Sequence, residues 1–123
     1  RYAPVTLNDS PRYLHRGLMI DTARHYLSVS EILRMIDSLV MNKFNKLHWH
    51  LVDAQSFPYD SPTEPTMING AFVNHNKQLT YTQNDLGAVK EYAHARGVEV
   101  IIEVDVPGHA ASWYWGKPEI AAC

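Results

Sequence analysis

The chain has 123 residues, of which 46% are hydrophobic and 20% are charged, and its formal net charge is −2. This is the composition of an ordinary globular domain, and it excludes a disordered chain. The near-neutral charge and scattered basic residues argue against nucleic-acid binding, and no apolar run approaches the roughly 20 residues of a membrane-spanning helix. The single cysteine, Cys123, argues against an internal disulfide framework and a cysteine-rich metal site.

The chain begins without clear periodicity and then changes to regular hydrophobic patterning. Residues 1–14 carry Pro4 and Pro11 and are predicted to form an irregular lead-in segment. Residues 15–123 are predicted to form one α/β unit. Within it, residues 15–21 have an apolar centre and are predicted to form a short strand.

A helix is predicted over residues 28–42 from both its cap and its hydrophobic spacing. Ser28 and Glu31 have capping-box spacing, in which each side chain accepts a hydrogen bond from the other residue's backbone N–H. Apolar residues from Ile32 to Val40 then recur at three- and four-residue intervals. This spacing is typical of a helix with one buried face.

A second helix and two further strands follow. The helix is predicted to begin at Thr82, which has an acidic residue three positions on, and to end at Gly97 in a left-handed conformation. Strands are predicted at residues 46–52 and 98–104. Both are apolar enough to be covered on two faces, as strands of a parallel sheet are.

Two segments lack regular patterning. Residues 54–79 contain three prolines and an Asn-Gly pair and are predicted to be a functional loop. Residues 110–123 are also predicted to be a loop. Together these segments carry aromatic side chains that either stack on a sugar face or pad the mouth of the fold: Phe57, Tyr59, Trp113 and Trp115.

An aspartate ends or follows each predicted strand, at Asp21, Asp53 and Asp105. The carboxyl ends of parallel strands meet at one edge of a sheet, where α/β enzymes build their sites. A single aspartate there is equally well explained as a helix cap, but three at equivalent positions favour a site. No glycine-rich phosphate motif follows any strand, which disfavours a nucleotide-binding sheet.

The order strand–helix–strand–loop–helix–strand predicts an α/β fold, namely the first three or so βα units of a (β/α)₈ TIM barrel. Such a barrel needs roughly 250 residues, so the predicted barrel is incomplete. Because its first and third strands would lack partners, we expect that the chain does not fold stably alone.

Two basic side chains lie just past predicted strand ends, and each has two interpretations. Arg24 either ties its loop by an ion pair with Asp21 or binds a polar substrate through its five donors. His109, after Pro107 and Gly108, is either an ordinary loop histidine or the partner of a carboxylate that tunes a catalytic acid.

His48 and His50 form an H-x-H pair, a spacing used by metal ligands. The pair supports an alternative function, a metal-dependent hydrolase on the same barrel. Side chains alternate along a strand, which places both histidines on the face opposite Asp53 unless a bulge intervenes. We therefore interpret them as packing or supporting histidines.

Three stretches resemble the start of the catalytic barrel of the family-20 glycoside hydrolases, the β-N-acetylhexosaminidases, and the lysosomal type above all. They are HRGLMIDTARHYLSV (15–29), NKFNKLHWHLVDAQSFPYDS (42–61) and VEVIIEVDVPGHAASW (98–113). The stretches occur in the family's order and spacing and together cover most of the chain.

This resemblance implies a retaining glycosidase that removes terminal, non-reducing N-acetylglucosamine or N-acetylgalactosamine, without a metal or organic cofactor. Most retaining glycosidases use two carboxylates, one of them as the nucleophile. In this family the 2-acetamido oxygen of the substrate attacks the anomeric carbon instead. A glutamic acid protonates the leaving oxygen, and an adjacent aspartate orients the acetamido group.

The resemblance also implies roles for individual residues. Arg24 would hold hydroxyl groups at the non-reducing end of the sugar. Asp53 and His109 would form a dyad that supports the catalytic glutamic acid, and Asp21 and Asp105 would order the site around them.

The chain departs from the family pattern at the acid itself. The family's Asp-Glu pair follows the fourth strand, and no glutamate of this chain occupies that place. We therefore expect the chain to be inert and the activity to belong to a longer parent. A parent without the pair would be a non-catalytic sugar-binding protein.

Two further expectations come from the same resemblance. Cys123 would pair with a cysteine beyond the catalytic carboxylates. Family membership, together with the glycosylation acceptor pattern Asn8-Asp9-Ser10, predicts a lysosomal or secreted location. The preference for gluco or galacto sugars and the oligomeric state are left open.

Overall fold

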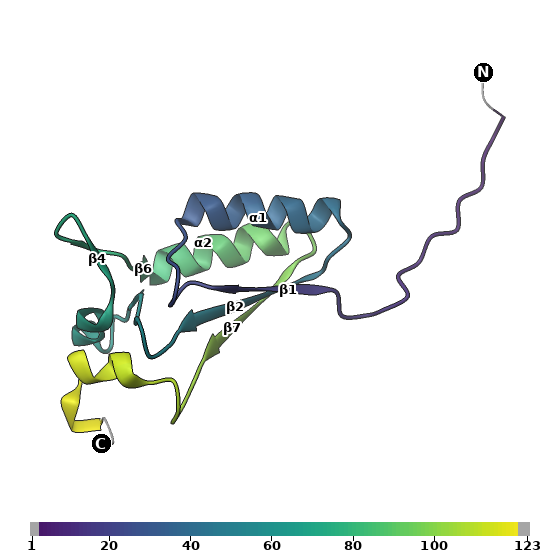
Figure 1. Ribbon diagram of the computed structural model, residues 1–123. Helices are drawn as coiled ribbons and strands as arrows, with labels where there is room; N and C mark the ends of the chain where they lie inside the picture. Colours follow the sequence, from purple (N-terminus) through teal and green to yellow (C-terminus); the bar gives the residue numbers. More distant parts are fainter. Residues whose placement is uncertain (1–2, 121–123) are drawn as a thin grey trace.

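The computed structural model describes residues 3–120, which are built around a three-stranded parallel sheet. Its strands, β1 (Gly17–Asp21), β2 (Lys46–Val52) and β7 (Glu99–Val104), lie in the order β1-β2-β7. Helices α1 (Val29–Met41) and α2 (Gln83–His94) lie together on one face of the sheet (Figure 1). The predicted strand–helix–strand order is confirmed, as are the parallel directions of the strands.

Helix α1 has the predicted cap and buried face. The Ser28 N–H donates to Oε2 of Glu31 over 2.7 Å, and the Glu31 N–H donates back to the Ser28 hydroxyl. This exchange satisfies two backbone donors that a helix start leaves unpaired. Ile32, Ile36 and Leu39 form the buried face.

Helix α2 is built in the same way. Thr82 and Asp85 form its capping box, and Val89 and Ala93 are fully buried. Gly97 follows the helix with a φ of 73°, the left-handed conformation that glycine adopts most easily. The predicted start and end of this helix are therefore both correct within the precision of such boundaries.

The core lies between the sheet and the two helices. Leu47, Trp49 and Leu51 alternate along β2 and are at most 1% exposed. The Trp49 ring packs edge-on against Tyr81, with 5.1 Å between ring centroids. Its indole N–H donates to the hydroxyl of Thr22 over 2.8 Å, so the buried tryptophan has no unpaired polar atom.

The segment between β2 and α2 has more structure than the irregular loop predicted for residues 54–79. It forms a 3₁₀ helix, a two-residue parallel pairing of β3 with β6 and a two-residue hairpin of β4 with β5. The elements are β3 (Tyr59–Asp60), η1 (Pro65–Gly70), β4 (Val73–Asn74), β5 (Lys77–Gln78) and β6 (Tyr81–Thr82). Elements this short lack the repeated spacing that makes longer ones visible in a sequence.

The C-terminal segment, predicted to be a loop, contains two 3₁₀ helices, η2 (Ala111–Trp115) and η3 (Pro118–Ile120). Helix η2 packs directly on η1. A Cβ added to Gly70 would lie 2.2 Å from the carbonyl oxygen of Ser112, a separation that no side chain tolerates. Glycine at position 70 therefore permits this contact, which holds the loop after β7 against the loop after β2.

The described residues before β1 contain no helix or strand and run away from the sheet (Figure 1). Their last residue, Arg16, is anchored by its N–H, which donates to Oδ1 of Asn45 over 2.9 Å. The division of the chain at residue 14 stays a prediction. No helix within residues 3–120 is long and apolar enough to span a membrane. The expected pairing of Cys123 falls outside the described residues.

Candidate active site

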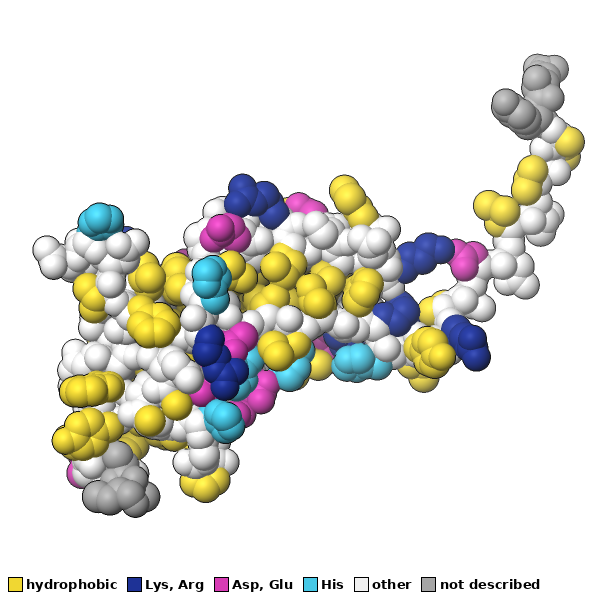
Figure 2. All heavy atoms as spheres, in the orientation of Figure 1, with side chains coloured by type: hydrophobic (Ala, Val, Ile, Leu, Met, Phe, Trp, Pro, Cys, Tyr) yellow, Lys and Arg dark blue, Asp and Glu magenta, His cyan; other side chains and the backbone are white. Residues whose placement is uncertain are grey.

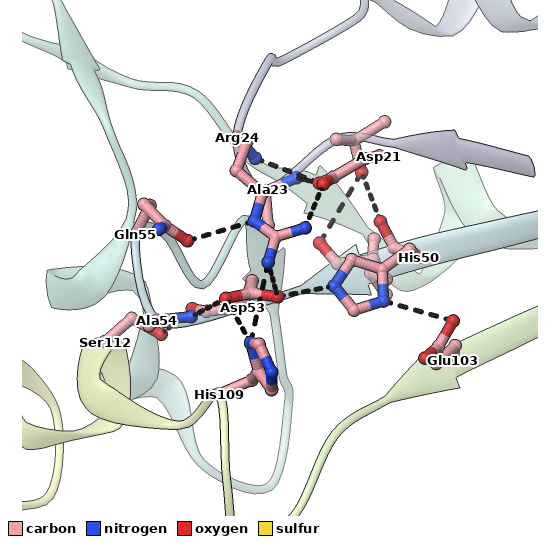
Figure 3. Close-up of polar contacts among 12 residues, drawn as sticks. Asp21, Ala23, Arg24, His50, Asp53, Ala54, Gln55, Glu103, His109 and Ser112 are labelled. Atoms are coloured by element: carbon pink, nitrogen blue, oxygen red, sulfur yellow. Dashed lines mark hydrogen bonds and ion pairs between the residues drawn. The ribbon is translucent and has the colours of Figure 1, made fainter.

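The carboxyl ends of the three strands carry the charged groups of the predicted site. Figure 2 shows acidic, basic and histidine side chains gathered beside these strand ends. Asp21 ends β1, Asp53 follows β2, and Asp105 follows β7. Arg24 and His109 reach Asp53 from the loops after β1 and β7 (Figure 3). The fold thus brings together the residues that the sequence predicted.

Asp53 is the centre of the cluster, and its carboxylate has four donors. Oδ1 accepts from the Ala54 N–H over 2.6 Å and faces Nδ1 of His109 at 3.2 Å. Oδ2 lies 2.7 Å from Nη2 of Arg24 and 2.8 Å from Nε2 of His50. Only 1% of the side chain is exposed, so protein groups, rather than water, fix its orientation.

These donors determine the charge of Asp53. Burial by itself would raise the pKa of the carboxyl. Hydrogen bonds from His50, the Ala54 N–H and His109, together with the charge of Arg24, outweigh burial and lower the pKa from 3.8 to about 2. Asp53 is therefore a carboxylate throughout the physiological pH range. It can orient and stabilise a positive neighbour, but it cannot act as a proton donor.

Arg24 makes the predicted loop-tying ion pair and remains accessible, while its role in substrate binding stays a prediction. Its Nη1 makes the loop-tying ion pair with Asp21 over 2.6 Å, and its Nε donates to Oε1 of Gln55 over 3.2 Å. Asp21 also accepts from the Arg24 N–H over 3.0 Å. The Arg24 side chain nevertheless stays 43% exposed. A held but accessible guanidinium can exchange part of its ion pairing for the hydroxyl groups of a ligand.

His109 is presented to the site by an unusual backbone conformation. Its φ of 57° is left-handed, although the residue is not a glycine. The side chain is 59% exposed, and its Nδ1 lies 3.5 Å from Nη2 of Arg24 as well as 3.2 Å from Asp53. With Nδ1–H donating to Asp53, Nε2 is the nitrogen left to accept a proton or a hydrogen bond.

The loops that carry these groups are tied to each other. The hydroxyl of Ser112, in η2, donates to the backbone carbonyl of Asp53 over 2.6 Å, and Ser112 is 1% exposed. Because Ser112 belongs to the same loop as His109, this bond fixes the loop after β7 relative to Asp53. No pattern in the sequence indicates this contact.

The exception allowed for the H-x-H pair, a bulge before Asp53, applies, and His50 faces Asp53. Nε2 of His50 lies 2.8 Å from Oδ2 of Asp53, and the ring is buried. The reason is a register shift in the pairing of β2 with β7 between His50 and Val52. An extra residue in one strand reverses the alternation beyond it, which returns the carboxylate to the face of His50.

Glu103 is the residue that the sequence interpretation missed. Both His48 and His50 contact its Oε2, the latter through Nδ1 at 3.1 Å. Burial would raise the pKa of Glu103, but the contacts with His50 and His48 outweigh it and lower the pKa. The available signal was strand register, because pairing Lys46 with Glu99 places His50 opposite Glu103.

The contacts of the histidine pair argue against the metal site of the alternative function. Both ring nitrogens of His50 are engaged by carboxylates, and His48 is directed at Glu103. Ligand atoms of His50, Asp53 and Asp105 do lie within 4.8 Å of one another. The Arg24 guanidinium already pairs with Asp53 there. A divalent cation would therefore have to displace Arg24 and take a nitrogen of His50 from its carboxylate.

The predicted aromatic residues separate into two groups. Phe57 is buried and packs edge-on against Trp113, with 5.9 Å between centroids. With Tyr59 they line a mainly apolar cavity of about 350 Å³. Trp115 is 67% exposed and contacts Tyr114 edge-on. Phe57 and Trp113 thus pack against each other, which fits the packing interpretation for these two.

Comparison with known proteins places this site in a family. Residues 13–123 match the catalytic domain of glycosyl hydrolase family 20. The chain is 50% identical over 118 residues to Beta-hexosaminidase subunit A1 of Dictyostelium discoideum, covering 96% of this chain and 22% of that protein. It is 50% identical over 115 residues to human Beta-hexosaminidase subunit beta, covering 94% of this chain and 20% of that protein.

A solved structure agrees with the fold. The family-20 exo β-N-acetylglucosaminidase of Vibrio harveyi, determined with N-acetylglucosamine, matches 89% of this chain with a TM-score of 0.80 and 34% identity, over 19% of its own length. The predicted partial (β/α)₈ barrel is confirmed by this match. The chain spans about a fifth of the length of its curated relatives. It belongs to glycosyl hydrolase family 20 and forms part of that family's catalytic domain.

Proposed function

We propose that the chain is part of a β-N-acetylhexosaminidase and supplies residues that bind the terminal sugar and support the catalytic acid. The observation that carries this proposal is the Asp53 carboxylate, which is buried, ionised and fixed between His109 and Arg24. The arrangement lies at the strand ends of a family-20 catalytic domain. Relatives at about 50% identity are named β-hexosaminidases, which supports the same activity for the whole protein.

The proposed substrate is a terminal, non-reducing N-acetylglucosamine or N-acetylgalactosamine on a glycan, a glycolipid or a chitin oligosaccharide. Arg24 would bind hydroxyl groups of this sugar, because its guanidinium is held in place by Asp21 and Gln55 and still exposed. The Vibrio harveyi relative was solved with N-acetylglucosamine, which supports the class of sugar. The proposed location, lysosomal or secreted, follows from the family assignment.

The proposed reaction retains configuration and uses the substrate's own acetamido group. Its carbonyl oxygen attacks the anomeric carbon as the bond to the leaving oxygen breaks, while a glutamic acid gives that oxygen its proton. This attack forms an oxazolinium ion. Water then attacks its anomeric carbon, which restores the acetamido group, and gives a proton to the glutamate. His109, held by Asp53 through Nδ1, would support that glutamic acid through Nε2.

Residues 1–123 alone are proposed to be inert, because the two carboxyl groups that contact His50 are not suited to donate a proton. A catalytic acid needs a pKa near the working pH. The pKa of Asp53 is lowered to about 2, and that of Glu103 is lowered by its histidine contacts. Both residues are therefore ionised and can accept a proton but not donate one. The proposed catalytic acid then belongs to another part of the parent protein.

The test uses the parent protein and aryl glycosides. We expect hydrolysis of an aryl N-acetyl-β-glucosaminide and no hydrolysis of the matching aryl β-glucoside, which lacks the acetamido group. Arg24→Lys keeps the charge but loses the planar fork, so KM should rise by about tenfold or more. Equal activity on both glycosides would refute the mechanism. A parent that binds N-acetylglucosamine without hydrolysing the glycoside would be the sugar-binding alternative.

A further inference from the structure

His50 lies between two carboxylates and touches both. Nε2 is 2.8 Å from Oδ2 of Asp53, and Nδ1 is 3.1 Å from Oε2 of Glu103 (Figure 3). A neutral imidazole has one N–H and can donate to only one of two carboxylates, whereas an imidazolium donates to both. The side chain is 7% exposed, so water does not replace either partner.

The surrounding charges favour the imidazolium. The acidic groups that face this cluster are Asp21, Asp53, Glu103 and Asp105, and the basic groups are Arg24, His48 and His109. Asp21, Asp53 and Glu103, whose pKa values are all lowered, thus face one permanently charged cation, Arg24. Burial lowers the pKa of His50, but the contacts with Asp53 and Glu103 outweigh burial and raise the pKa above 6.5.

We propose that His50, held by Glu103, is a positioning residue that keeps Oδ1 of Asp53 directed at His109. The proposal rests on the proposed function, because it concerns what happens when Arg24 binds sugar. Oδ2 of Asp53 has two side-chain donors, Arg24 and His50. A sugar competes for the guanidinium of Arg24, so His50 is the side-chain donor that stays on Oδ2 while substrate is bound.

Glu103 completes the arrangement from the neighbouring strand. The parallel register places it opposite His50, and its carboxylate lies on the ring nitrogen that Asp53 does not use. It therefore fixes both the ring orientation and its positive charge. Glu103 thus holds His50, His50 holds Asp53, and Asp53 holds His109. Only the last of these residues would face the catalytic acid.

The kinetic test compares His→Gln substitutions in the parent protein. His50→Gln should lower kcat by about tenfold to a hundredfold while KM changes by less than about twofold, because orientation and not binding is lost. Glu103→Gln should lower kcat in the same direction by a smaller factor. His94→Gln is the matched control, since His94 is exposed in the last turn of α2. A kcat for His50→Gln equal to that of the control would overturn the proposal.

A second measurement does not depend on activity. In protein labelled with ¹⁵N-histidine, both nitrogens of His50 should carry protons at about pH 7, where an unperturbed histidine is mostly neutral. The Nδ1 signal of His109 should move in His50→Gln and stay fixed in His94→Gln. A neutral His50, or an unmoved His109 signal, refutes the positioning role. Failure of the wild-type parent to hydrolyse the glycoside refutes the proposed function instead, and the spectra still decide the role of His50.

Discussion

The two faces of strand β2 have opposite chemistry, although they are built from alternating residues of the same strand. Toward the helices, β2 presents Leu47, Trp49 and Leu51, which belong to one buried apolar cluster. On the other face it presents His48 and His50, both in contact with an acidic side chain of β7. One face therefore holds the fold together, and the other arranges charges.

Substitutions on the two faces should therefore change different properties of the protein. Burial of apolar area stabilises the folded state by about 25 cal/mol per Å², and this term is concentrated on the helix-covered face. Charged groups on the other face contribute less to stability, because ion pairs offset the cost of burying their charges only in part. They set the orientation and protonation of neighbouring groups. Substituting them should therefore change catalytic activity more than the free energy of unfolding.

The largest effect on stability is expected for Trp49→Ala. Trp49 is fully buried and packs on Tyr81, so removing its ring leaves a cavity that costs about 3–5 kcal/mol of unfolding free energy. His48→Ala, one residue away on the other face, should cost less than about 1 kcal/mol, because the side chain is 40% exposed. Denaturant unfolding of the parent protein measures both. Equal losses would show that the two faces do not differ in this way.

The largest effect on activity is expected for Asp53→Asn. The amide keeps the shape of the carboxylate but loses its charge, so His109 is no longer held in one tautomer and kcat should fall by about 10²–10⁴-fold. Gln55→Ala serves as a milder comparison within the same loop, since Gln55 contacts Arg24 and not Asp53. Steady-state kinetics of the parent, with unfolding curves to show that each variant is folded, test this. A loss within about tenfold would contradict a supporting role for Asp53.

A smaller effect on stability is expected for Thr22→Val. This substitution tests whether the hydrogen bond from Trp49 to Thr22 stabilises the apolar face. The Trp49 indole N–H donates to the fully buried Thr22 hydroxyl. Valine preserves the volume but leaves the donor unpaired, at a cost of about 1–3 kcal/mol. Thr22→Ser, which keeps the hydroxyl, should lose less than the valine variant in the same unfolding measurement. The reverse order would show that the methyl group, and not the bond, matters at this site.

The sequence predicted the helices and strands of the helix-covered face more accurately than the side-chain contacts of the charged face. Both helices could be located because capping residues and hydrophobic spacing are local signals, as Ser28 with Glu31 and Thr82 with Gly97 show. The strands could be located for the same reason. The partial barrel then followed from their order and from the family resemblance.

The charged face carries His48, His50 and Glu103. Its contacts depend on how β2 and β7 pair, and this pairing cannot be read from either strand's sequence alone. The shift after His50 reverses the alternation that strand periodicity predicted. The contact of Glu103 with His50 depends on the register of two strands about fifty residues apart. Residues at the strand ends, such as Asp53 and Arg24, could still be found because the fold class itself fixes where they meet.

The smallest expected effect is the contribution of the charged face to the pH dependence of stability. The lowered pKa of Asp53 adds stability above its ordinary value of 3.8, and this is lost as the pH falls toward about 2. The raised pKa of His50 adds stability below 6.5 that is lost as the pH rises through its folded-state pKa. The pair should therefore stabilise the protein most between about pH 4 and 6.5, by at most about 2 kcal/mol from Asp53.

Thermal unfolding of the parent protein across this range separates the two contributions. Asp53→Asn should abolish its part of the decline on the acid side, and His50→Gln should abolish its part of the decline above about pH 6.5. Each substitution should also weaken the other decline, because Asp53 and His50 shift each other's pKa. Trp49→Ala should instead lower the unfolding temperature at every pH without changing the shape of the curve. A variant of the charged face that shifted the whole curve uniformly would show that its residue acts through packing. The distinction between a face that packs and a face that arranges charges would then not hold at that position.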